Sequence, residues 1–430
     1  MSMEINLFQA GKGDCILVRC GMGIKKVNIL IDSGMKKDYF LKALGRIVEN
    51  DEKIDVLILT HDDNDHIKGA SDLLRKLYRE ENNKKSAGIS SFFDVGVPEK
   101  TYKNLFEGLT DDRVLFNFGG NGTETLLGVR DAKELFENFR EMDIQNLKFV
   151  FSDTDEIPGV PYSNLLQLRW ENAGQDIQSK VIRHPNQKEL ESEGERLEVV
   201  ILSPEKQALV KYIQHAWEKL QEKDVLAKGG EKKPQSEWDR SVQYWLLNLE
   251  NYANKSKTSY VNQASIAFLL IYEGRCGLFA GDASPEEMIK AGRKYLERKQ
   301  IHQDYMEVDF IKLPHHGSSH NVNRAFFEFF RTKTFFVTTE GDVQYKHPGK
   351  VMLALIADSL KKGETAYIYS SYSWWKNNVV FRKSEKYKGN WNEEGDLCTL
   401  KDADGNIKYL HFQKLETEPV AIGKDIFVRR

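Results

Sequence analysis

The chain has 430 residues, 40 % of them hydrophobic, so it can bury a substantial core in one large domain or in several smaller ones. Its 62 basic side chains nearly balance 65 acidic ones, and this balance excludes a chain-wide basic field that would attract nucleic acid. The N-terminus lacks a signal-peptide pattern, and no apolar run is long enough to cross a bilayer. We therefore expect a cytoplasmic protein with no membrane association.

Strands separated by glycine turns are predicted along the N-terminal part of the chain. A helix-like segment at 38–50 precedes the last of four apolar, strand-like runs, which fall at 3–10, 14–20, 25–34 and 55–61. The spacing of leucine and isoleucine then predicts an amphipathic helix at 66–85. The polar, irregular stretch from about 82 to 194 is interpreted as an insertion.

A second series of strands is predicted after this insertion. The strand-like segment 196–204 is followed by two helix-like segments, 205–223 and 238–254, which predict a helical hairpin inserted between strands over 205–258. Strand patterns return at 264–274, 276–282, 308–317 and 334–341. Because strands and helices alternate in both halves, we expect an α/β fold, namely an αββα sandwich of two sheets with flanking helices.

The C-terminal part is rich in aromatic residues and lysines and predicts further β structure. We expect one fold domain over 1–385, which contains both insertions, and a β-rich extension over 386–430. An aromatic cluster in this part either stacks on nucleic-acid bases or packs within a sheet, and the second interpretation is favoured. The cluster comprises Tyr372, Trp374 and Trp375, beside Lys376 and Arg382.

Cysteine usage restricts the kind of metal site that the chain can build. The four cysteines are scattered without a CxxC pair, which argues against a disulfide framework and against a thiolate zinc site. Their positions are Cys15, Cys20, Cys276 and Cys398. Any bound metal is therefore expected to be held by His, Asp or Glu side chains.

The stretch THDDNDH directly follows an apolar strand and alternates nitrogen and oxygen donors. His61 and Asp63 can face one point of the loop while Asp65 and His66 face another, which implies two adjacent metal positions. The alternative is an acidic turn that caps the next helix, but two histidines in so short a stretch favour a metal. Asp62 faces away in this alternation, so we expect it to be solvated or to support the ligands from behind.

Further ligands are expected where later strands end. His315 and His316 lie in the turn FIKLPHHG, and His347 follows the strand-like FFVTTEG. Asp282 ends an apolar strand in a glycine turn, where a carboxylate can bridge two cations about 3.5–4 Å apart. Capping of the next helix is the alternative role for Asp282, although Ser284 is better placed as the cap.

Six motifs in this order resemble those of metallo-β-lactamase fold hydrolases, and most of all the branch that contains the hydrolase domain of the competence protein ComEC. They are FQAGKGDCILV, ILIDSG, THDDNDHIKGA, NQASIAFLLIYEGRCGLFAGDA, DFIKLPHHGSSHN and YKHP. In that branch an aspartate replaces the second histidine of the HxHxDH motif, as Asp63 does here. The membrane segments of ComEC are absent from this sequence, so DNA uptake is not implied.

The resemblance implies a set of site residues. It implies metal ligation by His61, Asp63, Asp65, His66 and His347, with Asp282 as a bridge. It leaves open whether His315 or His316 is the remaining ligand; we assign His315 to the metal and His316 to proton donation. Lys312 is expected to be catalytic, and four residues are expected to contact the substrate: Asn262, Ser265, Ser318 and His320.

Two divalent ions, Zn²⁺ or Mn²⁺, held in this way would lower the pKa of bound water and supply hydroxide for attack at phosphorus or carbon. We expect a phosphodiesterase or nuclease that cleaves DNA or RNA with this metal-bound hydroxide. The alternatives are a hydrolase of a small phosphodiester or ester, and a regulatory subunit of a multi-protein bacterial defence system. In the second alternative, a protein partner docks on the insertions.

Overall fold

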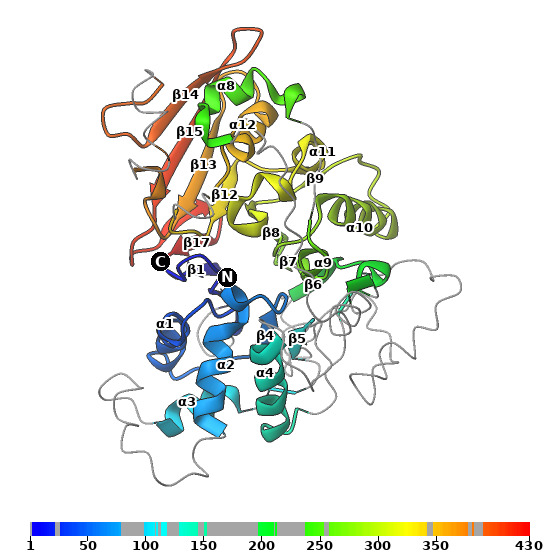
Figure 1. Ribbon diagram of the computed structural model, residues 1–430, viewed down its shortest axis with the longest axis vertical. Helices are drawn as coiled ribbons and strands as arrows, with labels where there is room; N and C mark the ends of the chain where they lie inside the picture. The colour runs from blue at the N-terminus through cyan, green and yellow to red at the C-terminus, as the bar shows by residue number, and fades with distance from the viewer. Residues whose placement is uncertain are drawn as a thin grey trace, which may run out of the picture.

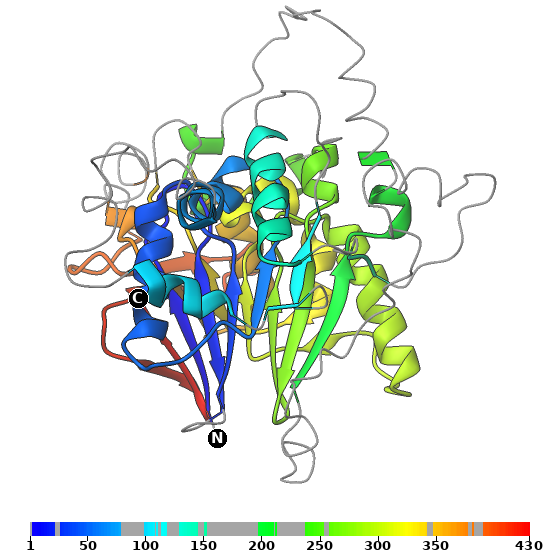
Figure 2. The same cartoon turned by 90° about the horizontal axis from the view of Figure 1, so that it is seen from below.

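Two large β-sheets face each other in the computed structural model of this chain, with helices on their outer sides (Figures 1 and 2). The structure describes residues 2–21, 26–78, 99–107, 109–110, 113–117, 129–144, 150–152, 197–209, 211–212, 237–252, 258–341, 347–376, 381 and 390–430. The insertion expected at 82–194 and the hairpin expected at 205–258 lie largely outside these described residues.

The first sheet has the strand order β16-β17-β1-β2-β3-β4-β5. Leu17, Leu30 and Leu57 on one face pack against helices, whereas Val18 and Ile29 point to the opposite face. Since both faces are buried, the central strands are mostly apolar. The strands are β1 (Met3–Leu7), β2 (Ile16–Cys20), β3 (Val27–Ile31), β4 (Val56–Leu59), β5 (Val114–Phe116), β16 (Val420–Gly423) and β17 (Ile426–Arg429). The helices outside it are α1 (Lys37–Val48), α2 (Asn64–Tyr78), α3 (Glu99–Phe106) and α4 (Val129–Glu141).

The second sheet has the order β14-β15-β13-β12-β10-β8-β7-β6. Its strands are β6 (Leu197–Ser203), β7 (Ala267–Tyr272), β8 (Arg275–Phe279), β10 (Phe310–Lys312), β12 (Thr334–Val337), β13 (Thr365–Ser370), β14 (Leu397–Lys401) and β15 (Ile407–Lys414). The helices that pack on its outer face are α8 (Val242–Leu246), α10 (Pro285–Arg298), α11 (Arg324–Phe329) and α12 (Lys350–Ser359). A two-stranded pair, β9 (Met306–Glu307) with β11 (Phe330–Arg331), lies beside them.

The core between the sheets is built from side chains on their inner faces. Phe268 stacks on Phe279 with ring centroids 5.1 Å apart, and Phe310 meets Phe336 at 4.7 Å. Together with the apolar residues of β1 to β4, these rings join both sheets into one buried layer. The expected αββα sandwich is therefore confirmed.

The residues after 386, expected as an extension, form strands in both sheets. β17 pairs in parallel with β1, and β15 pairs in parallel with β13. β14 and β16 each pair antiparallel with the next strand, β15 and β17, and so lie at the outer edges. The C-terminal residues therefore complete the sandwich, with the last strand, β17, beside the first, β1.

The aromatic cluster of the C-terminal part packs inside the molecule. Trp374 and Trp375 are 3 % and 2 % exposed, and the Trp375 ring stacks on Phe412 with centroids 5.6 Å apart. Phe381 and Trp391 extend the same group of rings. Base stacking by the two tryptophans is therefore wrong, and the favoured interpretation of core packing is confirmed.

The long helix expected at 238–254 is broken into shorter pieces. Among the residues of this stretch that the structure describes, α8 is the one α-helix, flanked by 3₁₀ turns at Glu237–Asp239 and Leu249–Asn251. Ser241 stops the helix from extending backwards, because its side chain accepts a hydrogen bond from the Tyr244 amide as an N-cap. Trp245 is 7 % exposed and packs on the second-sheet core.

Two smaller expectations concern cysteines and membranes. None of the four cysteines forms a disulfide, in agreement with the sequence-based expectation. Among the described residues, no helix is both long and apolar enough to cross a bilayer.

The packing of α10 against the end of β6 can be tested through Glu287, whose contribution to stability depends on pH. Its carboxylate accepts hydrogen bonds from the Glu205 amide at 3.1 Å and from the Ser203 hydroxyl at 3.4 Å. Burial, aided by the charge of Glu205, raises the pKa of Glu287 to about 7. The folded protein therefore binds a proton on Glu287 more tightly than the unfolded chain does. As the pH rises from the pKa of Glu287 in the unfolded chain to about 7, ionisation of Glu287 lowers the stability of the folded state.

We expect Glu287→Gln to stabilise the protein at pH 8, by up to about 3 kcal/mol, and much less at pH 5. Glutamine keeps an acceptor for both donors but cannot ionise. Thermal unfolding of both proteins across this pH range measures the difference. A stability gain that is equal at pH 5 and pH 8 would contradict the explanation.

Candidate metal centre

The centre lies where parallel strands from both sheets end. β3 pairs in parallel with β4 in the first sheet, and β8, β10 and β12 are parallel neighbours in the second. The carboxyl ends of parallel strands meet at one edge, where active sites of α/β sheets collect their residues. The THDDNDH loop follows β4, Asp282 follows β8, and the histidine pair follows β10.

Both histidines of the THDDNDH loop are buried, and hydrogen bonds to their Nδ1 atoms orient the rings. His66 Nδ1 lies 2.8 Å from Asp32 Oδ2, so this ring donates to the carboxylate and keeps its Nε2 lone pair. His61 Nδ1 lies 3.1 Å from Thr60 Oγ1 and 3.3 Å from Ser265 Oγ. Since the Thr60 hydroxyl itself donates to Asp32, its oxygen is left to accept from His61.

The HHG turn after β10 sends two adjacent rings to different places. His315, His316 and Gly317 all have positive φ angles, of 47°, 54° and 88°. Such consecutive left-handed conformations are costly outside glycine and mark a turn that its surroundings hold in place. Gly317 is needed here, because a Cβ atom would lie 2.5 Å from Pro348.

As for His66, acceptors beside the Nδ1 atoms of His315 and His316 favour the tautomer with the proton on Nδ1. His315 Nδ1 lies 2.9 Å from Asn321 Oδ1, and the amide of Asn321 is held in this orientation by donating to the Asp282 carbonyl at 2.7 Å. His316 Nδ1 lies 3.1 Å from Asp14 Oδ1 and 3.1 Å from the Thr338 carbonyl. With Nδ1 protonated, both rings direct an Nε2 lone pair forward.

Asp282 divides the centre into two groups of donors. The first, here called the His61 group, comprises His61, Asp63 and His315. His61 Nε2 lies 3.6 Å from Asp63 Oδ2 and 3.7 Å from Asp282 Oδ2. His315 Nε2 lies 3.6 Å from the same Asp282 oxygen.

The second, here called the His66 group, comprises Asp65, His66 and His316. His316 Nε2 lies 3.3 Å from Asp65 Oδ2, and His66 Nε2 lies 4.0 Å from that oxygen. His66 Nε2 also lies 3.6 Å from Asp282 Oδ1, the carboxylate oxygen that the His61 group does not face. Each oxygen of Asp282 therefore serves one group, which is the arrangement of a bridging carboxylate.

The donors fit two divalent ions. Metal–ligand distances of about 2.0–2.2 Å put neighbouring ligand atoms roughly 3–3.6 Å apart, close to the separations found here. Donor atoms of two overlapping triads, His61/His66/Asp282 and Asp65/His66/His316, lie within 4.8 Å of one another. Four of the converging atoms are buried without a hydrogen-bond partner: Nε2 of His61, His66 and His316, and Oδ1 of Asp282. Buried polar atoms are rarely left unpaired, so this convergence supports a cation site.

In the metal-free state, protons balance the carboxylates of the centre. Burial alone would raise the pKa of Asp282, but His315, His66 and His61 hold it well below its ordinary range. Burial opposes protonation of His316, yet Asp14 and Asp65 raise the pKa of His316 to about 9. Divalent ions held by these residues would replace the protons, so metal uptake would be coupled to proton release.

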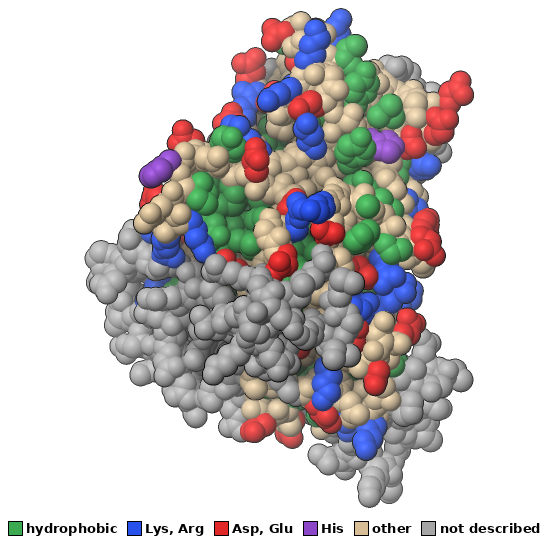
Figure 3. Space-filling model, turned by 180° about the vertical axis from the view of Figure 1, so that it is seen from behind, with side chains coloured by type: hydrophobic (Ala, Val, Ile, Leu, Met, Phe, Trp, Pro, Cys, Tyr) green, Lys and Arg blue, Asp and Glu red, His purple; other side chains and the backbone are tan. Residues whose placement is uncertain are grey.

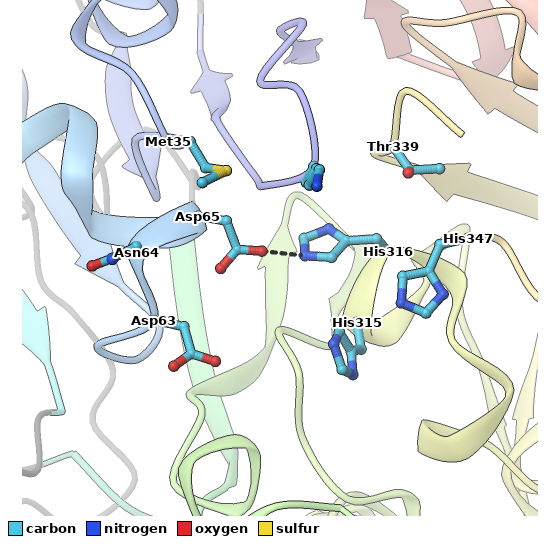
Figure 4. Close-up of a pocket in the computed structure, with 9 residues that line it drawn as sticks. Met35, Asp63, Asn64, Asp65, His315, His316, Thr339 and His347 are labelled. Atoms are coloured by element: carbon cyan, nitrogen blue, oxygen red, sulfur yellow. Dashed lines mark ion pairs between the residues drawn. The ribbon is translucent and has the colours of Figure 1, made fainter. Parts of the chain in front are cut away.

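A cavity of about 350 Å³ opens onto these groups (Figure 4). Asp63 and Asp65 face His315 and His316 across it, with His347 behind the histidine pair. Burial beside His315 and His316 lowers the pKa of His347 to about 3, so its imidazole is neutral. The lining residues are Lys12, Met35, Asp63, Asn64, Asp65, His315, His316, Thr339 and His347.

Some expected site residues lie behind the ligands instead of in the cavity. Lys312 is 1 % exposed and forms an ion pair with Asp14, so its ammonium does not line the cavity. Asn262 Nδ2 lies 3.1 Å from His315 Nδ1, and Ser265 Oγ accepts from the Asp282 amide at 2.9 Å. Asn262 and Ser265 therefore contact predicted ligands, His315 and His61. Lys312 contacts Asp14, which in turn holds His316, whereas direct action on substrate was expected for all three residues.

Ser318 and His320 also differ from expectation. Ser318 is buried and caps the next turn by accepting from the His320 amide at 3.3 Å. His320 is exposed and is absent from the cavity lining. His316, expected as a proton donor, lies within the His66 group.

Asp14 and Asp32 are functional residues that sequence reasoning missed. Both occur in motifs quoted for the resemblance, KGDC and LIDSG, but as single carboxylates they carry no spacing signal. Asp62 is 5 % exposed and accepts from the Tyr212 hydroxyl at 2.5 Å. Of its two expected roles, the solvated one is wrong.

Residues 9–77 match the model of the Metallo-beta-lactamase superfamily. This segment runs from the end of β1 to the end of α2 and carries Asp32 and the THDDNDH loop. The two-sheet sandwich, with buried His and Asp clusters at its strand ends, agrees with this match. Residues 9–77 are thus similar to that superfamily, and the buried clusters form a candidate binuclear metal site. No curated protein matches the chain.

Replacing Asp32 should weaken metal binding without removing a ligand. We expect Asp32→Asn to lower metal affinity about 10–100-fold, because the amide loses the charge that orients and polarises His66. Asp62→Asn is the matched control: it is a buried carboxylate in the same region, and asparagine still accepts from Tyr212. Competition titration with a chelator measures both affinities, and equal losses would show that Asp32 has no special role.

Proposed function

We propose that this protein is a two-metal phosphodiesterase, with DNA or RNA as its substrate. The observation that carries the proposal is the division of donors about Asp282, one group on each carboxylate oxygen, at the floor of an open cavity. Paired divalent ions activate water and neutralise the charge that develops at phosphorus. This is the chemistry that hydrolysis of an anionic diester requires.

The residues of the chain have separate parts in this reaction. Asp282 would hold the two metal positions together, and Asp32 and Asp14 keep His66 and His316 in the ligating tautomer. The neutral imidazole of His347 suits ligation or a hydrogen bond to substrate, and its low pKa makes it a poor proton donor at neutral pH.

The likeness to the ComEC hydrolase domain supports a nucleic-acid substrate, as does the fit of the centre to phosphoryl chemistry. A small phosphodiester is the second candidate, favoured by the cavity volume of about 350 Å³, which suits a ligand of small-molecule size. Basic and acidic side chains are interspersed over the described part of the face in Figure 3, so that face presents no broad basic track for a polymer backbone.

Cleavage assays distinguish the candidates. Purified protein is incubated with labelled single- and double-stranded DNA and RNA, and with bis(p-nitrophenyl) phosphate, in the presence of Mn²⁺ or Zn²⁺. Asp65→Ala/His66→Ala is the inactive control. Metal-dependent polymer cleavage supports the nuclease, whereas cleavage of the small diester alone supports the second candidate. If neither is cleaved, the proposal fails.

A further inference from the structure

One cationic side chain reaches the cavity from an unexpected place. Among the described lining residues, Lys12 is the one lysine or arginine. Lys312, which the sequence indicated for charge stabilisation, is turned inward onto Asp14. Among the described residues that line the cavity, positive charge for a substrate therefore comes from the Gly11–Gly13 loop.

This loop is fixed against the metal centre. Gly13 lies so close to the Asp65 backbone that a Cβ atom would be 1.7 Å from the Asp65 carbonyl oxygen. Gly11 has a φ angle of 72°, its amide donates to the Tyr372 hydroxyl at 2.8 Å, and its carbonyl accepts from the Glu340 amide at 3.0 Å. The backbone that carries Lys12 is thus held directly beside a predicted ligand.

The charge of the centre calls for such a cation. Three carboxylates, those of Asp63, Asp65 and Asp282, would offset three of the four positive charges of two divalent ions. An attacking hydroxide would offset the remaining one, so the loaded centre has little net attraction for an anion. The ammonium of Lys12, a residue that lines the cavity, would restore that attraction by donating to a phosphoryl oxygen.

We propose that Lys12 is the specificity-determining residue of this site, and that it binds a non-bridging oxygen of an anionic phosphoryl group. The inference rests on the proposed function and narrows it to anionic substrates. Neutral esters gain nothing from Lys12. Among the described lining residues, Lys12 is therefore the side chain that would favour a phosphodiester over a carboxylic ester.

Binding of inorganic phosphate tests the inference without turnover. In metal-loaded protein, Lys12→Met should weaken phosphate binding, measured by calorimetry, about tenfold or more, and Lys12→Arg should keep it within about threefold. Elemental analysis should give the same metal content in every variant. Lys362→Met, at an exposed lysine in the turn after α12, is the matched control and should bind phosphate as the unmodified protein does. Lys12→Gln replaces Lys12→Met if the latter does not fold.

Kinetics with two chromogenic substrates separate the inference from the proposed function. Lys12→Met should raise KM for bis(p-nitrophenyl) phosphate about tenfold while leaving p-nitrophenyl acetate hydrolysis unchanged. Unchanged phosphate affinity in both Lys12→Met and Lys12→Gln would overturn the inference even if diesters are cleaved. If no diester is cleaved but phosphate binding depends on Lys12, the proposed function fails and the inference stands.

Discussion

Asp282→Asn is expected to abolish hydrolysis and to lower the metal content from two ions per chain. Each oxygen of Asp282 faces a different group of donors, with His61 Nε2 at 3.7 Å from one and His66 Nε2 at 3.6 Å from the other. An amide offers one neutral oxygen and cannot bridge two cations. Loss of an outer partner costs about 10–100-fold, so loss of the bridge should cost about a thousandfold or more in kcat/KM.

Elemental analysis and diester hydrolysis, measured on the same samples, check this expectation. Asp309→Asn is the matched control: Asp309 is an aspartate just before β10, at the end opposite His315, and it accepts from the Cys276 amide at 2.7 Å. The control should retain both metals and activity. If Asp282→Asn also keeps two metals and most of its activity, Asp282 is not the bridge.

Metal should also stabilise the folded chain. The four converging donor atoms are buried without partners in the metal-free protein, and a cation that binds only the folded state adds its binding free energy to stability. We expect Zn²⁺ or Mn²⁺ to raise the thermal midpoint of the unmodified protein, and a chelator to reverse the rise. Asp65→Ala/His66→Ala should show neither response, and an equal rise in that variant would place the metal elsewhere.

The fold was largely predictable from the sequence, because buried strands are recognisable as apolar runs bounded by turn residues. The predicted segments 14–20, 25–34 and 55–61 contain β2, β3 and β4. Segment 308–317 contains β10, and segment 276–282 covers all of β8 except its first residue. The exception at 238–254 has a local cause. Ser241 caps a short helix there, and the apolar periodicity continues through 3₁₀ turns that pack on the same core.

The site was predictable only where ligands cluster in sequence. His61, Asp63, Asp65 and His66 form a pattern within one loop, whereas the partners of these residues come from distant parts of the chain. Asp14 and His316 are 302 residues apart and meet only because β10 ends beside the loop before β2. No periodic rule predicts that neighbouring histidines in left-handed conformations will join different groups.

Lys312 shows why a motif residue can have a different role from the one its chemistry suggests. A lysine beside a predicted phosphodiesterase centre is naturally assigned to the substrate. Its Nζ instead forms a fully buried ion pair with Asp14 Oδ2, and the Thr338 hydroxyl and His316 ring share that carboxylate. Burial alone would raise the pKa of Asp14, but Lys312 and His316 hold it well below its ordinary range.

Lys312→Met should therefore destabilise the protein, because it leaves Asp14 as a buried charge without its main partner. We expect a loss of about 3 kcal/mol, in the lower part of the range for a broken buried pair, since His316 remains beside the carboxylate. Adding Asp14→Asn should recover part of this loss, because asparagine removes the unpaired charge and can still accept from His316. Urea unfolding of the single and double variants measures the coupling. If the Lys312→Met protein is as stable as the unmodified one but turns over more slowly, the original prediction that Lys312 acts on the substrate is supported instead.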